Sequence, residues 1–457
     1  MQLHKIYIIL FVLTILAASC RHLNTKQTAY LRGKIVNPRA DNVIISRDFL
    51  MLQSDTLGLL SENEVAGPIK VPEEGLYIIY IFPEYQTIYL KPGDSLAFHL
   101  NVDEFDESIS FSGSSGFENN LMMSVFLIDE QESDYFYRHN FQFDLQNFNR
   151  KIDSFQNLKK RTIESYREEL AETSQLYQNI LSLLAKSMDF NLKEVYAQKH
   201  TYEKLSPDFF AYCSVLHREL PDPNIIYMYA FADSFLERQL KSEKTKIKNP
   251  YWKISEIIDR EIYDSKFKDN LLVKYCSRYI KGKLVAEKDA TVNNFYQKIK
   301  SRLYKDYCDS LIAKNKLMQE GNHFPESFYL TIDKRRLPSD SLFPPGSKTL
   351  VSFWDLRFRK NFVSNLKKME AFQKAYPDMQ LVVINTNAGY FDEWLLQKPV
   401  SSHMKFVQAI DRKQVNKIKP FLLSQVYLLD GNKIKASMRN MYAPGFDKEL
   451  RKFNSEK

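Results

Sequence analysis

The long middle of this chain, from Asn119 to about Glu320, constrains the fold most, because glycine nearly vanishes from it while charged residues are dense. Apolar residues recur there three and four positions apart, as they do between Leu176 and Phe190, which is the period of an amphipathic helix. Proline interrupts this pattern because it cannot continue a helix. The breaks fall at Pro207, at Pro221-Asp222-Pro223 and at Asn249-Pro250. We therefore expect a helical region over residues 117–320, made of several helices.

Length and composition indicate several globular domains rather than one. At 457 residues the chain exceeds what a single hydrophobic core usually organises. The 13 glycines against 27 tyrosines and 32 phenylalanines favour helices over an all-β chain. The net charge of +8 is modest for this length, and acidic residues are interspersed with the basic ones. We therefore expect no nucleic-acid partner.

Residues 29–116 have the pattern of short strands separated by turns. Turn signals such as Asn37-Pro38 and Lys91-Pro92-Gly93-Asp94 lie between runs rich in β-branched and aromatic residues. The expected strands are Tyr30 to Val36, Val43 to Ser46, Leu76 to Phe82, Thr87 to Leu90, Ser95 to Leu100 and Ser108 to Phe111. This predicts a small antiparallel β domain.

Residues 321–457 alternate between strand-like and helix-like segments. The expected strands are Phe328 to Ile332, Leu350 to Trp354, Leu381 to Asn385 and a hairpin from Val426 to Ala436 that turns at Asp430-Gly431. The expected helices are Lys360 to Tyr376, Phe391 to Leu396, Arg412 to Ile418 and Phe446 to Phe453. A βαβ half followed by a ββα half is the order of the thioredoxin fold. The whole chain is therefore expected to be an α+β multidomain protein whose last domain is α/β.

The N-terminus carries the pattern of a lipoprotein leader. His4 and Lys5 precede an apolar stretch from Ile6 to Leu16, and the small residues Ala17-Ala18-Ser19 come directly before Cys20. The apolar stretch is too short for a lasting transmembrane helix. A cysteine at this point resembles the bacterial lipobox, which implies lipidation of Cys20 and attachment of the mature protein to a membrane by its acyl chains.

This leader sets the expected boundaries and location. Residues 1–19 would be the signal peptide and residues 20–28 a lipidated linker. The residues after Cys20, Arg21-His22-Leu23-Asn24-Thr25-Lys26, lack the acidic cluster that resembles a surface-export tag of Bacteroidetes. We therefore expect a lipid-anchored protein of the bacterial cell envelope, on the outer membrane and facing the periplasm.

Two parts of the chain resemble domains of Bacteroidetes lipoproteins. Leu31 to Ile35, Ser54-Asp55-Thr56, Leu90 to Leu96 and Phe111 to Ser114 look like the β domain of unknown function found upstream of thioredoxin-like domains. From Phe324-Pro325-Glu326-Ser327-Phe328 to the terminal helix, the chain resembles the TlpA and ResA branch of thioredoxin-like proteins. That resemblance implies a thioredoxin-like fold over residues 321–457.

The redox motif of that family is missing here. In the family, a strand ending in Phe-Trp is followed by a Cys-x-x-Cys at the start of the next helix, whose dipole lowers the pKa of the first thiol. Here Phe353-Trp354 is present, but Phe358 and Asn361 occupy the two cysteine positions, and Ser424 occupies the position of the family's cis-proline. Thiol-disulfide exchange therefore has no chemical basis at this site, and we expect no catalytic residue there.

Basic residues replace the motif. Arg357, Arg359 and Lys360 lie at the expected start of a helix, where positive charge opposes the helix dipole. With the helix N-terminal amides they could bind a carboxylate or phosphate, and Arg335 and Arg336 could join them. The alternative is a solvated loop whose charges face water. With Trp354 and Phe358, these basic residues are expected to border a binding surface.

The remaining cysteines and histidines suggest no further site. Cys213, Cys276 and Cys308 lie in helix-like apolar stretches and are expected to be buried and inert, although a bridge between Cys276 and Cys308 is left open. No pair of histidines has the spacing of a metal site, so we expect neither metal nor cofactor.

Two functions remain open on this reasoning. The first is a non-enzymatic envelope lipoprotein whose thioredoxin-like domain binds or scaffolds a protein or peptide partner, since such a surface can survive loss of the thiols. The second is a thiol-disulfide oxidoreductase of the envelope that uses Cys213, Cys276 or Cys308 instead of the usual motif.

Overall fold

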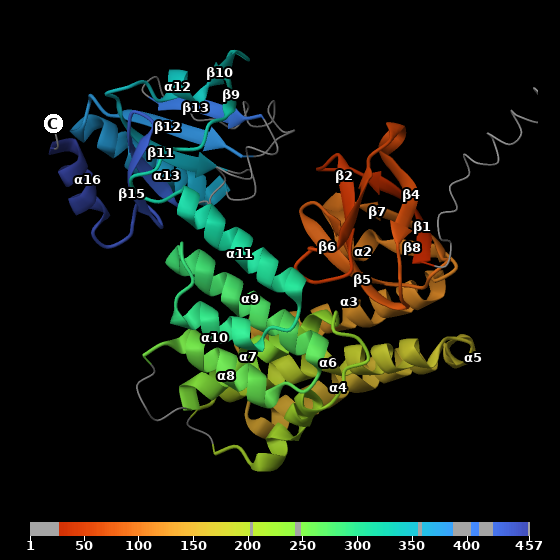
Figure 1. Ribbon diagram of the computed structural model, residues 1–457. Helices are drawn as coiled ribbons and strands as arrows, with labels where there is room; N and C mark the ends of the chain where they lie inside the picture. Colours follow the sequence, from red (N-terminus) through yellow and green to blue (C-terminus); the bar gives the residue numbers. More distant parts are fainter. Residues whose placement is uncertain are drawn as a thin grey trace, which may run out of the picture. The chain divides into compact units, whose positions relative to one another are not determined.

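The computed structural model describes residues 27–201, 204–242, 248–354, 359–386, 404–410 and 424–455 (Figure 1). The chain divides into two compact units. Met1–Lys246 with Glu261–Phe267 forms the first, and Ile247–Arg260 with Lys268–Lys457 forms the second. The first unit holds a β domain and helices, and the second holds helices and a larger sheet. This confirms the expected α+β chain of several domains.

Some expected features lie outside the described residues. They are the leader with Cys20 and the helices expected over Phe391 to Leu396 and Arg412 to Ile418. Among the helices that the structure does describe, none combines the length and the apolar character needed to cross a bilayer.

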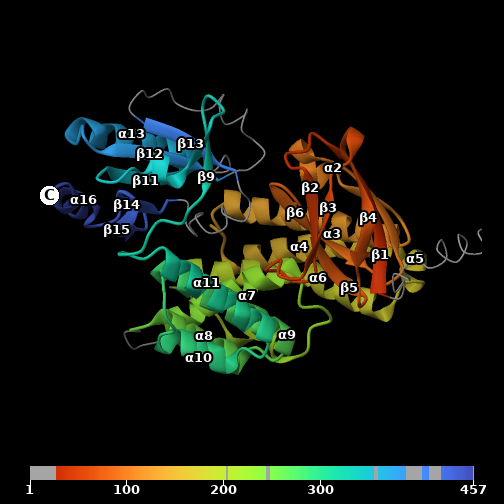
Figure 2. The ribbon, with the colours of Figure 1, turned by 45° about the horizontal axis from the view of Figure 1, so that its top comes forward.

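Two four-stranded sheets share one hydrophobic core in the β domain, which Figure 2 shows from a second side. Their strand orders are β4-β1-β7-β8 and β3-β2-β5-β6. The strands are β1 Thr28–Val36, β2 Asn42–Ser46, β3 Ser54–Gly58, β4 Glu64–Lys70, β5 Gly75–Ile81, β6 Glu84–Leu90, β7 Ser95–Asn101 and β8 Ser110–Gly113. The pairs are antiparallel apart from β1 and β7, which run parallel from Tyr30 opposite Ser95 to Val36 opposite Asn101.

Local sequence explains two details of the sandwich. Gly33 of β1 lies under the ring of Phe98, its partner on β7, and a Cβ at this position would come within 2.0 Å of that ring, so only glycine fits. Strands β3 and β4 were not expected from the sequence. Strand β4 contains Pro68, which is tolerated because β4 is an edge strand and its missing N–H costs no ladder bond.

The short helix α2 Phe105–Ser108 and the 3-10 helices η2 Ser61–Asn63 and η3 Val102–Glu104 lie between strands of the β domain. The helices that follow the domain are α3 Gly116–Arg138, α4 Leu145–Glu164, α5 Arg167–Ala171, α6 Gln175–Lys199 and α7 Ile226–Ser242, with the 3-10 helix η4 Pro207–His217. Asp144 and Ser174 cap α4 and α6 by accepting hydrogen bonds from the amides of Asn147 and Tyr177. Pro207 starts a 3-10 segment rather than continuing α6, as its lack of an N–H requires.

A buried lysine joins the three long helices of this unit. The Nζ atom of Lys159 on α4 lies 2.6 Å from Asp129 Oδ1 and 2.7 Å from Glu132 Oε2 on α3, and 2.9 Å from Asp189 Oδ1 on α6. The side chains of Lys159, Asp129 and Glu132 are fully buried. Three carboxyl groups therefore surround one ammonium group, and burial raises the pKa of Asp129 to about 7 and that of Glu132 to about 8.

The second unit begins with helices and ends in a seven-stranded sheet. The helices that precede the sheet are α8 Pro250–Glu261, α9 Ser265–Lys283, α10 Ala290–Lys298 and α11 Arg302–Leu317. Helices α9 and α11 lie side by side and run in the same direction. The hydroxyl of Tyr304 donates to Asn270 Oδ1, and further along both helices the Asn315 amide donates to the carbonyl oxygen of Ile280.

The sheet has the strand order β10-β9-β13-β12-β11-β14-β15. Its strands are β9 Phe328–Thr331, β10 Arg336–Pro338, β11 Lys348–Trp354, β12 Gln380–Asn385, β13 Met404–Ala409, β14 Val426–Asp430 and β15 Lys433–Met438, and its helices are α12 Ser339–Leu342, α13 Arg359–Ala375 and α16 Phe446–Ser455. Strands β11, β12 and β13 are parallel, and β14 and β15 complete the sheet as an antiparallel hairpin. The order β12-β11-β14-β15, with α13 after β11 and α16 after β15, is the thioredoxin arrangement expected from the sequence.

Alternate side chains of β11 point to opposite faces of the sheet and so contribute to two hydrophobic cores. Leu350 and Trp354 pack with residues of α13 and α16 on one face of the sheet, while Val351 and Phe353 pack with Phe324 and other residues on the opposite face. A strand buried on both faces reads as a continuous apolar run, which is why Leu350 to Trp354 was recognisable in the sequence.

Candidate functional site

The family's redox motif would lie between the end of β11 and the start of α13. Residues 355–358, which include Arg357 and Phe358, lie outside the described part of the chain. Arg359 is the first residue of α13, and Lys360 and Asn361 follow in its first turn, but the side chains of these three residues also lie outside what the structure describes. Their proposed contribution to an anion site or a binding surface therefore stays a prediction.

Trp354 lies in the core rather than on a surface. Its side chain is 2% exposed and packs with Leu366 and Met369 of α13. Its backbone carbonyl accepts a hydrogen bond of 3.0 Å from the Thr386 amide, which follows β12. A ring in this position supports the sheet and its covering helix and presents no face to a partner.

The other described residues singled out from the sequence have structural contacts. Ser424 lies just before β14, and its hydroxyl donates a hydrogen bond of 2.9 Å to the carbonyl oxygen of Arg439 beyond β15. Arg335 forms an ion pair with Asp333, and the guanidinium of Arg336 lies 4.0 Å from the centre of the Phe328 ring. Both arginines thus contact residues of the hairpin β9–β10, to which they themselves belong.

The three cysteines of the helical region are poor nucleophiles. Cys213 on η4 contacts Glu194 Oε1 at 3.4 Å and Arg238 at 3.6 Å, and burial together with the Glu194 carboxylate raises the pKa of its thiol to about 12. Cys276 on α9 and Cys308 on α11 are completely buried. Hydrogen bonding with Cys308, followed by burial, raises the pKa of the Cys276 thiol well above its usual value. Since the attacking species in disulfide exchange is the thiolate, these environments suppress that chemistry.

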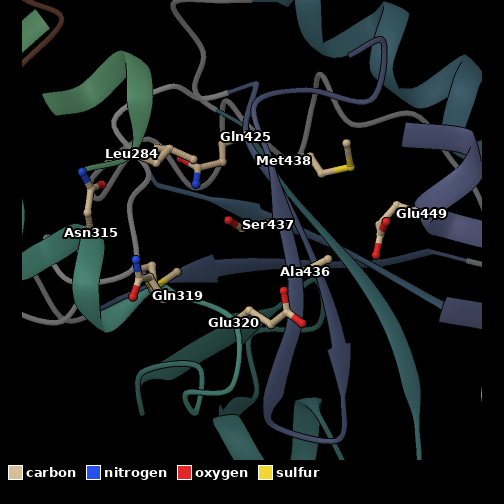
Figure 3. A pocket seen from close by; sticks show the side chains of 10 residues that line it. Leu284, Asn315, Gln319, Glu320, Gln425, Ala436, Ser437, Met438 and Glu449 are labelled. Atoms are coloured by element: carbon tan, nitrogen blue, oxygen red, sulfur yellow. The ribbon is translucent and has the colours of Figure 1, made fainter. Parts of the chain in front are cut away.

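A cavity in the second unit is a better candidate for a binding site (Figure 3). It has a volume of about 520 Å³ and lies where the end of α11 meets the hairpin β14–β15. Gln425, Ala436, Ser437 and Met438 line one side of it, and Glu320, beyond the end of α11, lines another. Gln425 is 3% exposed, yet no hydrogen bond joins its side-chain amide to any residue that the structure describes.

This cavity was not predicted from the sequence. From the sequence, Gln425 has no assigned role, and Glu320 is only the end of the expected helical region. Nothing in the linear pattern indicates that Glu320 and Gln425, more than 100 positions apart, lie at one site. The one usable signal was the expected hairpin from Val426 to Ala436, whose last residue lines the cavity.

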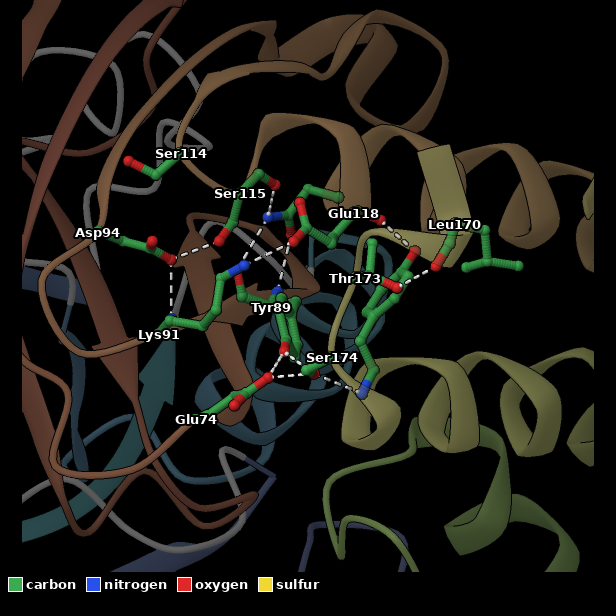
Figure 4. A network of polar contacts seen from close by, with 12 residues as sticks. Glu74, Tyr89, Lys91, Asp94, Ser114, Ser115, Glu118, Leu170, Thr173 and Ser174 are labelled. Atoms are coloured by element: carbon green, nitrogen blue, oxygen red, sulfur yellow. Dashed lines mark hydrogen bonds and ion pairs between the residues drawn. The ribbon is translucent and has the colours of Figure 1, made fainter. Parts of the chain in front are cut away.

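A polar network in the first unit is structural (Figure 4). The hydroxyl of Tyr89 on β6 contacts Glu74 and, at 3.0 Å, the Ser174 hydroxyl at the start of α6. The Asn119 side chain on α3 pairs with both backbone groups of Tyr89, at 2.7 and 2.9 Å. Burial and the Glu74 hydrogen bond raise the pKa of the Tyr89 hydroxyl. Hydrogen bonds of Tyr89 therefore connect β6 to α3 and α6, and its hydroxyl stays protonated.

No group of three or more histidine, cysteine, aspartate or glutamate side chains in the described ranges could hold a metal ion. The expectation that the protein has no cofactor stays an expectation.

Comparison with known protein families finds no match, and neither does comparison with curated protein sequences. Among solved structures, the chain is similar to the C-terminal domain of a protein described as a thiol-disulfide oxidoreductase from Bacteroides thetaiotaomicron, at 13% identity over 32% of this chain and 100% of that one, with a TM-score of 0.26. The thioredoxin domain of a thiol-disulfide oxidoreductase from Bacteroides vulgatus matches at 17% identity over 30% of this chain and 99% of that one, with a TM-score of 0.24.

A thioredoxin-like protein from Porphyromonas gingivalis matches at 14% identity over 30% of this chain and 92% of that one, with a TM-score of 0.25. These neighbours cover only about a third of the chain, and at such low scores the fold assignment rests on the strand order and connections described above. On that basis, the C-terminal domain has a thioredoxin-like fold.

Proposed function

We propose that this protein is a lipid-anchored component of the bacterial cell envelope whose thioredoxin-like domain binds a protein or peptide partner and does not exchange disulfides. One observation carries the proposal. After β11, where the fold would present a redox motif, the chain has Phe358 and Asn361, and no cysteine occurs between Cys308 and the last residue. A thioredoxin-like domain without the two redox cysteines keeps its surfaces but cannot exchange disulfides.

The alternative, an oxidoreductase that uses the cysteines of the helical region, has one observation in its favour. Cys276 and Cys308 are hydrogen-bonded neighbours on adjacent helices. Their complete burial and the raised pKa of Cys276 oppose it, because exchange requires an accessible thiolate.

A disulfide-reduction assay distinguishes the two functions. The mature chain is incubated with insulin and excess dithiothreitol, and insulin reduction is followed against a protein-free control. We expect no rate above the control. A rate above it that disappears in the Cys213→Ser, Cys276→Ser, Cys308→Ser triple variant would establish the alternative instead.

A matched variant tests whether the absence of the two thiols is the reason that the chain does not reduce insulin. Phe358→Cys with Asn361→Cys restores both cysteine positions at the start of α13. We expect this double variant to reduce insulin faster than the wild-type chain, because the helix dipole at this position favours a thiolate. If it remains as inactive as the wild type, other features of the site also prevent exchange.

The membrane anchor is tested separately. The motivation is the apolar leader from Ile6 to Leu16 followed by Cys20. In cells fed labelled palmitate we expect label on the wild-type protein and none on the Cys20→Ser variant, which should be found in the soluble fraction. Rapid cleavage of the wild-type protein by protease added to intact cells would contradict the periplasm-facing orientation.

A further inference from the structure

Strand β15 is an edge of the seven-stranded sheet, and its first half is already covered. On the side away from β14, the Ile434 carbonyl accepts from the Gly321 amide and the Ile434 amide donates to the Asn322 carbonyl, both at 2.8 Å. The Phe324 amide donates to the carbonyl of Asn432, and His323 bridges Lys433 in antiparallel fashion. The chain itself therefore uses this edge as a template for an added extended segment.

The second half of the same edge is open. Beyond Ile434, β15 pairs with β14 at Ala436, Ser437 and Met438, and no backbone hydrogen bond reaches the far side of these residues from the part of the chain that the structure describes. Alternate residues of an edge strand direct their N–H and C=O groups away from the sheet. Beyond Ile434, the path that Gly321 to Phe324 follow along β15 therefore has no backbone partner among the described residues.

The cavity beside this open edge contains polar groups that lack partners. Gln425 is 97% buried, and its amide lines the cavity without a hydrogen bond to any described residue. A ligand inside the cavity that hydrogen-bonds to this amide would give it the partner that the described residues do not supply. Figure 3 shows Glu320 and Glu449 at the cavity. The exposed Glu320 carboxylate has no ion pair among the described residues, whereas Glu449 Oε1 lies 3.7 Å from Lys452 Nζ.

We propose that the open half of the β15 edge, with this cavity, binds an extended polypeptide segment that carries a basic side chain. The segment adds a strand beside Lys435 to Met438, Gln425 hydrogen-bonds to it, and its lysine or arginine meets Glu320. Strand addition supplies affinity through backbone bonds, and the pocket supplies selectivity. The inference rests on the proposed binding function and names the surface that performs it.

The binding experiment uses the full mature chain and a capped peptide, acetyl-Lys-Val-Lys-Val-Lys-amide, with titration by calorimetry. We expect saturable binding, and slower hydrogen–deuterium exchange in peptic fragments that contain Lys435 to Met438. The same peptide with every backbone nitrogen methylated should not bind, because it has no amide N–H left to donate to the strand edge. A peptide with glutamate in place of lysine should bind more weakly.

Two variants and a matched control locate the site. Gln425→Leu removes the amide at similar volume and should weaken binding about five-fold, the value of one hydrogen bond. Glu320→Gln should weaken it about two- to five-fold, as expected for an exposed ion pair. Glu370→Gln on the exposed face of α13 removes the same charge elsewhere and should leave affinity unchanged, and circular dichroism checks that each variant is folded.

Several results would overturn the proposal. They are absence of binding at millimolar peptide, equal affinity for the N-methylated peptide, or equal affinity in all three variants. If sedimentation shows a dimer that Gln425→Leu dissociates, the occupant of the edge is a second copy of the chain. The insulin assay is independent of these outcomes, so failure of the proposed function and failure of the proposed surface are separable.

Discussion

Lys159 shows how one buried residue can hold three helices together. Its ammonium group lies within 3 Å of carboxylates on α3 and α6, and none of these groups reaches solvent to any large extent. Burial lowers the pKa of Lys159, but the three carboxyl groups outweigh that effect and raise it. A buried ion pair is weak evidence for stability, yet removing one partner of it is costly because the others remain buried and unpaired.

Replacing Lys159 should therefore strongly destabilise the first unit. We expect Lys159→Met to lower the free energy of unfolding by about 3–5 kcal/mol, since the ammonium is lost while the carboxyl groups stay buried. Denaturant unfolding followed by circular dichroism measures this. Lys160→Met is the matched control, because Lys160 is an exposed neighbour on the same helix and its loss should cost less than about 1 kcal/mol. Equal effects of the two substitutions would contradict the structural role of Lys159.

The same cluster should make stability depend on pH. The pKa values of Asp129 and Glu132 are raised to about 7 and about 8 in the folded protein, so the folded state binds protons more tightly than the unfolded state does. Their contribution is fully present below about pH 4 and is lost as pH rises toward 8, by up to about 1.4 kcal/mol per pH unit for each group.

The check is denaturant unfolding between pH 5.5 and 8.5. The wild-type chain should become less stable across this range, and an Asp129→Asn, Glu132→Gln double variant should show a smaller dependence because its side chains cannot titrate. An unchanged slope in the double variant would assign the pH dependence to other groups.

At the scale of elements, helices α9 and α11 enclose the Cys276 and Cys308 thiols. Both side chains are completely buried, and the pKa of Cys276 is raised. We expect iodoacetamide to modify neither cysteine in the native protein and both in guanidinium, as read by mass spectrometry of tryptic peptides. Cys213, which is only partly buried, should react faster than these two but more slowly than a free thiol, because its pKa is about 12.

Elements were predictable where local pattern decides them. Strand β11 was found because an apolar run marks a strand buried on both faces, and the helices of the middle region were found because their apolar residues keep a helical period. Strand β4 was missed because Gly67 and Pro68 interrupt its pattern, and the parallel pairing of β1 with β7 is decided by tertiary packing. The cavity was missed for the same reason, since Gln425 and Glu320 meet only in the folded chain.

At the scale of the molecule, the chain passes between its two compact units three times. It leaves the first unit after Lys246, returns for Glu261–Phe267 and leaves again. The returning segment is well integrated into the first unit. Phe267 is 1% exposed and its ring lies 5.0 Å from that of Tyr229 on α7, while the Tyr263 amide donates to the carbonyl oxygen of Leu216 at 2.8 Å.

Phe267→Ala should therefore destabilise the first unit although residues of the second unit follow it directly in sequence. We expect a loss of about 3–5 kcal/mol, as for other buried phenylalanines. Hydrogen–deuterium exchange should show faster exchange in α7 and little change in β12 of the second unit. Faster exchange in both to the same degree would mean that the two units unfold as one.

The triple passage also limits how such a gene can be rearranged. A recombination event with a single breakpoint between residues 246 and 268 would leave the first unit without Phe267 or give the second unit an incomplete helical layer. Each unit is built from two separate stretches of sequence, so exchanging one unit for another requires both of its stretches to be replaced together. The two units should therefore be inherited together. Shuffling is simpler for the β domain alone, whose strands β1 to β8 form one continuous stretch of coding sequence.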